Sequence, residues 1–270
     1  MKSSLYHKKS PIKDLQEDAF VLHPVYKLAG VFDGVTPLNS YKNKYQENGA
    51  HIASHLFSRY FLYEYNPEIT LKEGILSANK KLKEEMQKEA IDLNDKSYLW
   101  STCAAIILFE EEKVHYAQAG DCMILAEMHD GKIKEVTKNS VRGISKRAKA
   151  KRETERKAGK DIYTEEFYSS NFLASKAYNR KMANTEQGYS VCNGEEALEN
   201  FIQTGFLNKD EIKSILLLSD GLFFPEKDMA YIMEEALKNG LSLLAEKIKR
   251  TEQKMGLRPD DRTAILLRLM

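Results

Sequence analysis

The spacing of apolar residues predicts two amphipathic helices in the first third of the chain. The apolar stripe of the first helix consists of Ala53, Leu56, Phe57, Tyr60 and Phe61. That of the second consists of Leu71, Ile75, Ala78, Leu82 and Met86, with lysine and glutamate on the opposite side. In both segments the apolar residues return after three or four positions, so they share one side of a helix. We expect that side to face a protein core.

Short apolar runs predict two groups of strands in the first half of the chain. The first group is Ala19–His23 and Leu28–Asp33, joined by a turn that begins at His23-Pro24. The second group is Ser101–Glu110, Val114–Gly120, Cys122–Met128 and Lys132–Thr137, with a strong hairpin signal at Asp130-Gly131. We expect the second and third strands of this group to be neighbours of the first. Consecutive strands of this kind favour antiparallel pairing.

The second half of the chain alternates helices and strands after a polar interruption. Residues 138–194 are polar and begin with many lysines and arginines, so we expect an excursion from the core with one basic helix at about Lys146–Lys157 and otherwise irregular chain. Further helices are expected near Glu195–Gly205, Asp228–Lys238 and Leu241–Met255. The apolar runs Ser214–Ser219 and Arg262–Leu269 predict buried strands.

This order of elements indicates the fold class. Strands at both ends of the chain, with helices between them, favour an α+β fold in which two sheets are covered by helices. Hydrophobic residues make up 42% of the chain and charged residues 30%, which is ordinary for a folded soluble protein. We expect residues 1–270 to form a single domain from which residues 138–194 project.

Charge and cysteine content argue against several kinds of protein. The 41 basic and 40 acidic residues nearly cancel, so no overall field favours nucleic acid or an anionic membrane. The three cysteines form no CxxC pair, which argues against a disulfide framework and favours a reducing compartment. The first residues lack the apolar core of a signal peptide, and no apolar run approaches the roughly 20 residues of a membrane span. We expect a cytoplasmic protein.

Aspartates stand beside apolar runs at four places, usually next to glycine. They are Asp33-Gly34, Asp121, Asp220-Gly221 and Asp260-Asp261. Each one alone is explained by the preference of aspartate and glycine for turns. Together they place carboxylates at strand ends, and carboxylate oxygens are the ligands that Mg²⁺ and Mn²⁺ prefer. The sequence therefore predicts a site for divalent cations, and two such ions about 3.5–4 Å apart would activate a water and clamp a phosphoryl group.

The order and spacing of these motifs resemble the metal-dependent Ser/Thr protein phosphatases of type 2C, over nearly the whole chain. The matching segments are Gln16–Ala19, Asp33-Gly34, Ser101-Thr102, Gly120–Met123, Leu218–Leu222 and Asp260–Thr263. They are similar, in this order, to the family's N-terminal acidic block, its D-G-H-G-G box, its strand with paired hydroxyls, its G-D-S-R box, its L-x-S-D-G-L block and its terminal D-N-x-T. Any one match is weak, but several in the right order are specific.

The resemblance implies a four-layer αββα sandwich with two Mn²⁺ or Mg²⁺ ions in a channel between the sheet edges. By position, Asp33, Asp220 and Asp260 would be direct metal ligands. The carbonyl of Gly34 would be another. The implied activity is hydrolysis of phosphoserine and phosphothreonine in proteins, by in-line attack of a water that bridges the two ions.

The resemblance also implies roles for residues around the metals. Glu17 and Asp18 would hold metal-bound waters, and Asp121 would serve a third, looser ion. Lys13 takes the place of a basic residue that grips the phosphate, although an ammonium is a point charge and not a bidentate fork. Residues 138–194 take the place of the family's variable flap beside the channel.

Two departures from the family pattern bear on catalysis. The histidine of D-G-H-G-G, which is thought to protonate the leaving group, is Val35 here, and the arginine of G-D-S-R is Met123. A positioned general acid is typically worth about 10²–10⁴-fold in rate. The alternative to an active phosphatase is therefore a pseudophosphatase that keeps the fold and the metal site but recognises phosphoproteins without turnover.

Other features have simpler interpretations. His51 and His55 are one helical turn apart, opposite the apolar stripe, and we expect a solvated pair. The basic run Lys146–Lys157 is either a water-exposed helix or a docking site for a phosphorylated partner, whereas nucleic acid is an unlikely partner because the overall charge is balanced. Cys122 and Trp100 are expected to be core residues.

Overall fold

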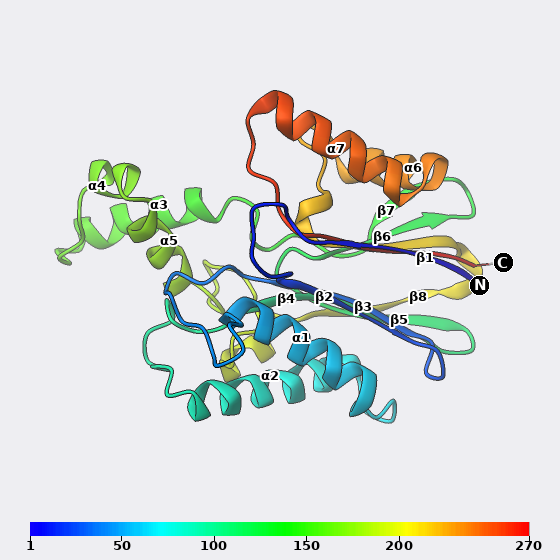
Figure 1. Cartoon of the computed structure of the whole chain (residues 1–270), viewed down its shortest axis with the longest axis horizontal. Coiled ribbons are helices and arrows are strands. Elements are labelled where there is room, and N and C mark those ends of the chain that lie inside the picture. Colours follow the sequence, from blue (N-terminus) through cyan, green and yellow to red (C-terminus); the bar gives the residue numbers. More distant parts are fainter. Residues whose placement is uncertain (270) are drawn as a thin grey trace.

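The computed structural model describes residues 1–269, which form two stacked antiparallel sheets of five strands each, covered by helices on both outer faces (Figure 1). One sheet has the order β1 (Lys2–Lys8), β10 (Arg262–Arg268), β9 (Ile212–Leu218), β6 (Met123–Met128) and β7 (Ile133–Glu135). The other has the order β2 (Asp18–His23), β3 (Leu28–Gly34), β4 (Thr102–Phe109), β5 (Lys113–Ala119) and β8 (Gln203–Asn208).

Helices complete the four layers. Helices α1 (Gly49–Tyr63) and α2 (Leu71–Lys88) cover the sheet that contains β3, and α6 (Met229–Asn239) and α7 (Leu241–Met255) cover the sheet that contains β9 (Figure 1). This arrangement confirms the expected α+β sandwich of two antiparallel sheets. It also confirms the two helices near the end of the chain.

The central strands of each sheet are buried on both faces. In β9, Ile215 and Leu217 belong to the core between the sheets, whereas Leu216 and Leu218 pack toward α6 and α7. Because one face meets the other sheet and the second face meets helices, both faces of β9 are apolar from Ile215 to Leu218. This explains why the sequence shows unbroken apolar runs here and no alternation.

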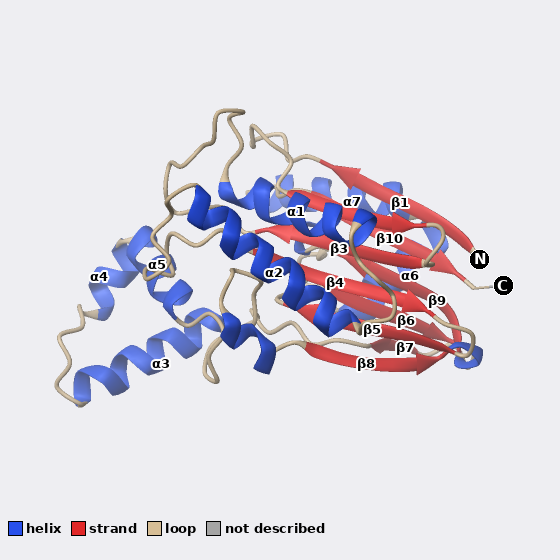
Figure 2. Ribbon diagram, turned by 90° about the horizontal axis from the view of Figure 1, so that it is seen from below, coloured by secondary structure: helices blue, strands red, loops and turns tan. Residues whose placement is uncertain are grey.

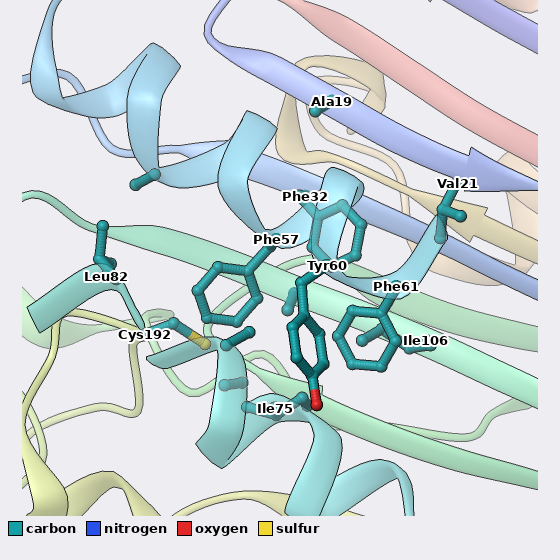
Figure 3. Packing of buried hydrophobic residues seen from close by; sticks show 14 of the residues in the cluster. Ala19, Val21, Phe32, Phe57, Tyr60, Phe61, Ile75, Leu82, Ile106 and Cys192 are labelled. Carbon is teal, nitrogen blue, oxygen red and sulfur yellow. The ribbon is translucent and has the colours of Figure 1, made fainter. Parts of the chain in front are cut away.

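The predicted apolar stripes of α1 and α2 pack against β3 and β4. Figure 3 shows the side chains of Phe57 and Phe61 directed at Phe32 of β3, with ring centroids 5.9 Å apart in both pairs. Thr70 begins α2 with a capping box. The hydroxyl of Thr70 accepts a hydrogen bond from the backbone N–H of Glu73, and the backbone N–H of Thr70 donates one to the side-chain carboxylate of Glu73. Trp100 is buried, as expected.

The prediction that the second and third strands of the second group are both neighbours of β4 was partly wrong. Strand β5 pairs with β4, but β6 pairs with β9 in the opposite sheet, and the second neighbour of β4 is β3. The chain changes sheet at Gly120, which has a φ of 92° and lies so close to β4 that a Cβ would come within 2.2 Å of the sulfur of Cys103. Apolar patterning gives the strands but not the sheet to which each belongs.

Two further strands were not predicted. Strand β1 pairs only with β10 and is largely exposed, so its sequence KSSLYHK has little apolar signal. The helix expected at Glu195–Gly205 is a short 3-10 helix, Glu196–Asn200, followed by β8, which starts at Gln203. Both strands lie at sheet edges, where one-sided burial leaves a weak pattern.

Residues 138–194 contain three helices, not one. They are α3 (Ile144–Lys157), α4 (Glu165–Ser170) and α5 (Phe172–Lys181), and they extend beyond one end of the sandwich (Figure 2). The predicted basic helix is present as α3, but it is not wholly exposed. Arg152 is buried between the rings of Tyr168 and Tyr178, with its guanidinium carbon 4.2 and 4.9 Å from their centroids. It also forms an ion pair of 2.8 Å with Glu165 of α4.

The histidine pair on α1 also differs from its prediction. His51 and His55 are half-buried and stacked, with ring centroids 3.8 Å apart, and Nδ1 of His51 lies 2.7 Å from the carbonyl oxygen of Gln16. The pair therefore packs against the segment that precedes β2.

Across residues 1–269, no helix combines the length and apolar character that a bilayer crossing requires.

Loss of the Phe57 side chain is expected to destabilise the fold strongly. Phe57 is fully buried under β3, so Phe57→Ala leaves a cavity and should lower the free energy of unfolding by about 3–5 kcal/mol, measured by urea denaturation. Tyr63 lies on the same helix with 77% of its surface exposed, so Tyr63→Ala should change stability by about 0.5 kcal/mol or less. Equal losses in the two variants would contradict the packing described.

Candidate functional site

Carboxylates from both sheets meet at one pocket. Asp33 is near the end of β3, Asp121 follows β5, Asp220 follows β9, and Asp260 precedes β10. All four line a pocket of about 290 Å³, together with the backbone of Gly34. The structure thus brings together the aspartates that the sequence placed beside four separate apolar runs.

The negative charges of these aspartates repel one another. Burial raises the pKa of Asp33 well above its usual value, and the neighbouring carboxylates of Asp18 and Asp220 raise it further. Burial likewise raises the pKa of Asp220 to about 8, with contributions from Asp121 and Asp260. A cluster of this kind is costly to ionise unless positive charge compensates it.

Asp18 is buried behind the pocket and does not line it. One of its carboxylate oxygens accepts hydrogen bonds of 2.7 Å from the hydroxyls of Ser219 and Thr263. Burial raises the pKa of Asp18 to about 7, although these two hydrogen bonds act in the opposite direction. Asp18 therefore joins the ends of β2, β9 and β10 directly behind Asp33, its partner in the β2–β3 register.

Glu17 is also buried outside the pocket lining. Its carboxylate accepts from the amide of Asn48 at 2.7 Å and from the hydroxyl of Thr36 at 2.8 Å, and it pairs with the ammonium of Lys13 at 2.7 Å. Asn48 is the N-cap of α1. Glu17 thus fixes the loop after β3 relative to the first helix.

Lys13 is surrounded by acids. Its ammonium lies 2.7 Å from Glu17, 2.5 Å from Asp260 and 3.3 Å from Asp261, and its side chain is 11% exposed. Although burial opposes it, hydrogen bonding to Asp260 and Glu17 raises the pKa of Lys13. The cation expected to grip a phosphate therefore also holds several of the carboxylates together.

Asp261 was not singled out as a site residue, yet it organises the N-terminal part of the site. Its buried carboxylate accepts from the backbone N–H groups of Ser10 at 2.6 Å and Glu17 at 2.7 Å, in addition to pairing with Lys13. These bonds attach residues 10–17 to the start of β10. The doubled aspartate before the last strand was the only sequence signal for this role.

Glycine is required at two points of the site. A Cβ at Gly34 would lie 2.5 Å from the carbonyl oxygens of Glu17 and Ala50, and a Cβ at Gly221 would lie 1.9 Å from that of Asp261. Real side chains do not fit at these distances. The Asp-Gly pairs therefore reflect close packing of backbone behind the carboxylates as well as turn formation.

Sequence reasoning missed the contribution of α5 to this pocket. Lys176, Asn179 and Arg180 line it from the flap side. The guanidinium of Arg180 donates to the backbone carbonyl of Thr36 at 2.7 Å and to that of Leu99 at 3.4 Å. This part of the chain has no apolar or acidic pattern that would mark a site.

The two departures from the family pattern have different surroundings. Val35 is half-buried, lines the pocket and packs into the core between the sheets. Met123 is buried in β6 within the core that faces α6 and α7. The side chain of Val35 thus presents carbon, and no titratable group, to the pocket.

The pocket suits hard divalent cations by its chemistry. Its carboxylates and the backbone at Gly34 offer only oxygen donors, which Mg²⁺ and Mn²⁺ prefer, and positive charge would relieve their repulsion. Across residues 1–269, no three histidine, cysteine, aspartate or glutamate side chains already surround a common point as metal ligands. The donor set fits, and Lys13 occupies part of the space between Asp260 and Glu17.

Solved structures of bacterial phosphatases share this architecture. The serine/threonine phosphatase Stp1 from Staphylococcus aureus matches with a TM-score of 0.60 and 15% identity over 100% of this chain and 95% of its own. PstP/Ppp from Mycobacterium tuberculosis matches with a TM-score of 0.59 and 18% identity over 99% and 98%. The catalytic domain of PstP in complex with two manganese ions matches with a TM-score of 0.61 and 16% identity over 98% and 96%.

At these identities the structural matches establish the fold, and the family assignment comes from the sequence itself. No curated protein matches the sequence. The family model for protein phosphatase 2C matches residues 4–254, which extend from β1 to the end of α7 and include Asp33, Asp121 and Asp220. The chain belongs to the protein phosphatase 2C family.

Proposed function

We propose that this chain hydrolyses phosphoserine and phosphothreonine esters in proteins with the help of divalent cations. The observation that carries the proposal is the meeting of four aspartates from both sheets in one pocket. Asp33, Asp220 and Asp260 would hold two Mn²⁺ or Mg²⁺ ions, together with the carbonyl of Gly34. Asp121 would hold a third ion.

In this proposal the residues behind the pocket position the ligands. Bound Mn²⁺ or Mg²⁺ would supply a nucleophile at neutral pH and offset the charge of the phosphoryl group. Asp18 and Glu17 would act through water, since neither lines the pocket. The buried hydroxyls of Ser219 and Thr263 orient Asp18, and Lys13 keeps Glu17 and Asp260 close together.

The family and the surface of the flap support the proposed substrate class. The family acts on phosphoproteins, and we propose that such a substrate docks on the basic segment 146–157. Lys146, Lys149 and Lys157 are exposed on α3, whereas Arg152 faces the tyrosines of the flap. Exposed lysines offer an attractive surface to an acidic or phosphorylated segment.

The pocket has a weakness as a catalyst, which favours the pseudophosphatase as the second candidate. Protonation of a departing serine or threonine alkoxide needs a donor, and Val35 cannot provide one. The nearby hydroxyl of Thr36 is already donated to Glu17. An aryl leaving group needs little protonation, so aryl phosphates should be the better substrates.

The first test measures Mn²⁺-dependent hydrolysis of an aryl phosphate and a phosphothreonine peptide. Wild type should turn over the aryl ester, and Asp220→Asn should reduce that rate by at least about 10²-fold because it removes a proposed ligand. Asp130→Asn is the matched control, since Asp130 lies in the turn between β6 and β7, does not line the pocket, and asparagine suits such a turn equally well. Undiminished turnover in Asp220→Asn would refute the mechanism. Mn²⁺ binding without any turnover would support the pseudophosphatase.

The second test restores an imidazole at position 35. Val35→His should raise kcat for the phosphothreonine peptide, up to the 10²–10⁴-fold typical of a general acid, and should change aryl phosphate turnover little. The ratio of the two rates is the readout. Val35→Asn is the control for a polar side chain that cannot transfer a proton. A parallel change for both substrates would show that Val35 affects only the packing of the pocket.

A further inference from the structure

Helix α5 presents cations to the acidic pocket from the side opposite the sheets. Lys176 and Arg180 are one helical turn apart on α5, and both line the pocket that contains Asp33 and Asp220. The pocket therefore has a wall of carboxylates at the strand ends and a wall of cations on the flap. A phosphate dianion that approached the carboxylates alone would be repelled, so a cation beside it matters for binding.

The cation that the family pattern assigns to this task is already neutralised. Three carboxylates surround the ammonium of Lys13, and two of them lie within 2.7 Å. Even if bound ions drew Asp260 away, Glu17 and Asp261 would remain beside it. Little of the charge of Lys13 is left for a ligand.

Arg180 differs from Lys13 in that, among residues 1–269, no carboxylate pairs with its charge. It is buried, and among residues 1–269 it forms no ion pair, because its partners are the neutral carbonyls of Thr36 and Leu99. Burial lowers the pKa of Arg180. By holding the loop after β3, it places α5 over the pocket and adds an uncompensated positive field there.

Lys176 is the cation that can reach a ligand. Its side chain is exposed at the pocket, its ammonium lies 4.5 Å from the ring centroid of Phe172, and the described part of the chain gives it no ion pair. Partial burial lowers the pKa of Lys176, and the charges of Arg180 and Arg258 lower it further. An ammonium among other cations gains most from an anionic partner.

We propose that Lys176 binds the phosphate of the substrate and that Arg180 is its positioning residue. This inference rests on the proposed function, and it assigns phosphate recognition to the flap instead of Lys13. The ammonium would donate to phosphate oxygens that face away from the carboxylates. Lys13 would then serve to hold the acidic wall together.

The test compares Lys176→Gln with Lys181→Gln. Lys181 is the last residue of α5 and does not line the pocket, so both variants lose one charge from the same helix. The affinity for inorganic phosphate is measured in the presence of Mn²⁺, both by calorimetry and as inhibition of aryl phosphate turnover. We expect about a tenfold loss for Lys176→Gln, as for a charged hydrogen bond, and no change for Lys181→Gln. Lys176→Arg should retain most of the affinity.

Failure of this inference is distinguishable from failure of the proposed function. If wild type hydrolyses the aryl ester and Lys176→Gln binds phosphate as tightly as wild type does, only the inference about Lys176 is overturned. Absence of turnover in wild type would count against the proposed function, and the calorimetric titration would still decide the role of Lys176. Wild type that binds no phosphate with Mn²⁺ present would also overturn the inference.

Discussion

Repulsion among carboxylates gathered in one pocket is the constraint on which the rest of this structure depends. Asp33, Asp121, Asp220 and Asp260 are carried to one pocket by strands of two different sheets. They cannot move apart, because the strands that carry them are packed on both faces; Val31 and Phe32, which precede Asp33, are fully buried. The fold therefore imposes an electrostatic cost that positive charge must offset.

The surroundings of the pocket supply that charge in an ordered way. Lys13 pairs with the acids at the edge of the cluster, and α5 adds Lys176 and Arg180 on the opposite side. Divalent cations would supply the remainder. Residues 138–194 are attached to the site, because their helix α5 is anchored to the loop after β3 through Arg180.

Much of the fold was predictable because most core elements show either a helical period or an unbroken apolar run. The stripes of α1 and α2 and the apolar runs of β4, β9 and β10 each reflect burial against a large partner. The missed elements lack such burial. Strand β1 is an exposed edge. In the flap, Arg152 stacks on two tyrosines, a contact that has no signal in an ordinary basic sequence.

The residues of the candidate site also divide into those that a local sequence pattern marks and those that it does not. The aspartates at strand ends were found because apolar runs and glycines mark their positions. Lys176, Arg180 and Asp261 were missed, since their importance arises from contacts between segments distant in the sequence: Arg180 meets Thr36, and Asp261 meets Ser10 and Glu17. The crossing of the chain from one sheet to the other at Gly120 likewise depends on tertiary contacts and has no local sequence pattern.

The most direct test of this account is the thermal unfolding of wild type and Asp33→Asn at pH 8, with and without Mn²⁺. Folding raises the pKa of Asp33, so its ionisation costs stability as the pH rises above the unfolded value of about 3.9. Without metal, the variant should therefore have the higher Tm. With Mn²⁺ at about 100 times its Kd, wild type should gain roughly 2.7 kcal/mol and the variant far less, which reverses the order. An equal Mn²⁺ shift in both proteins, or none in wild type, would contradict a metal centre built on repelling carboxylates.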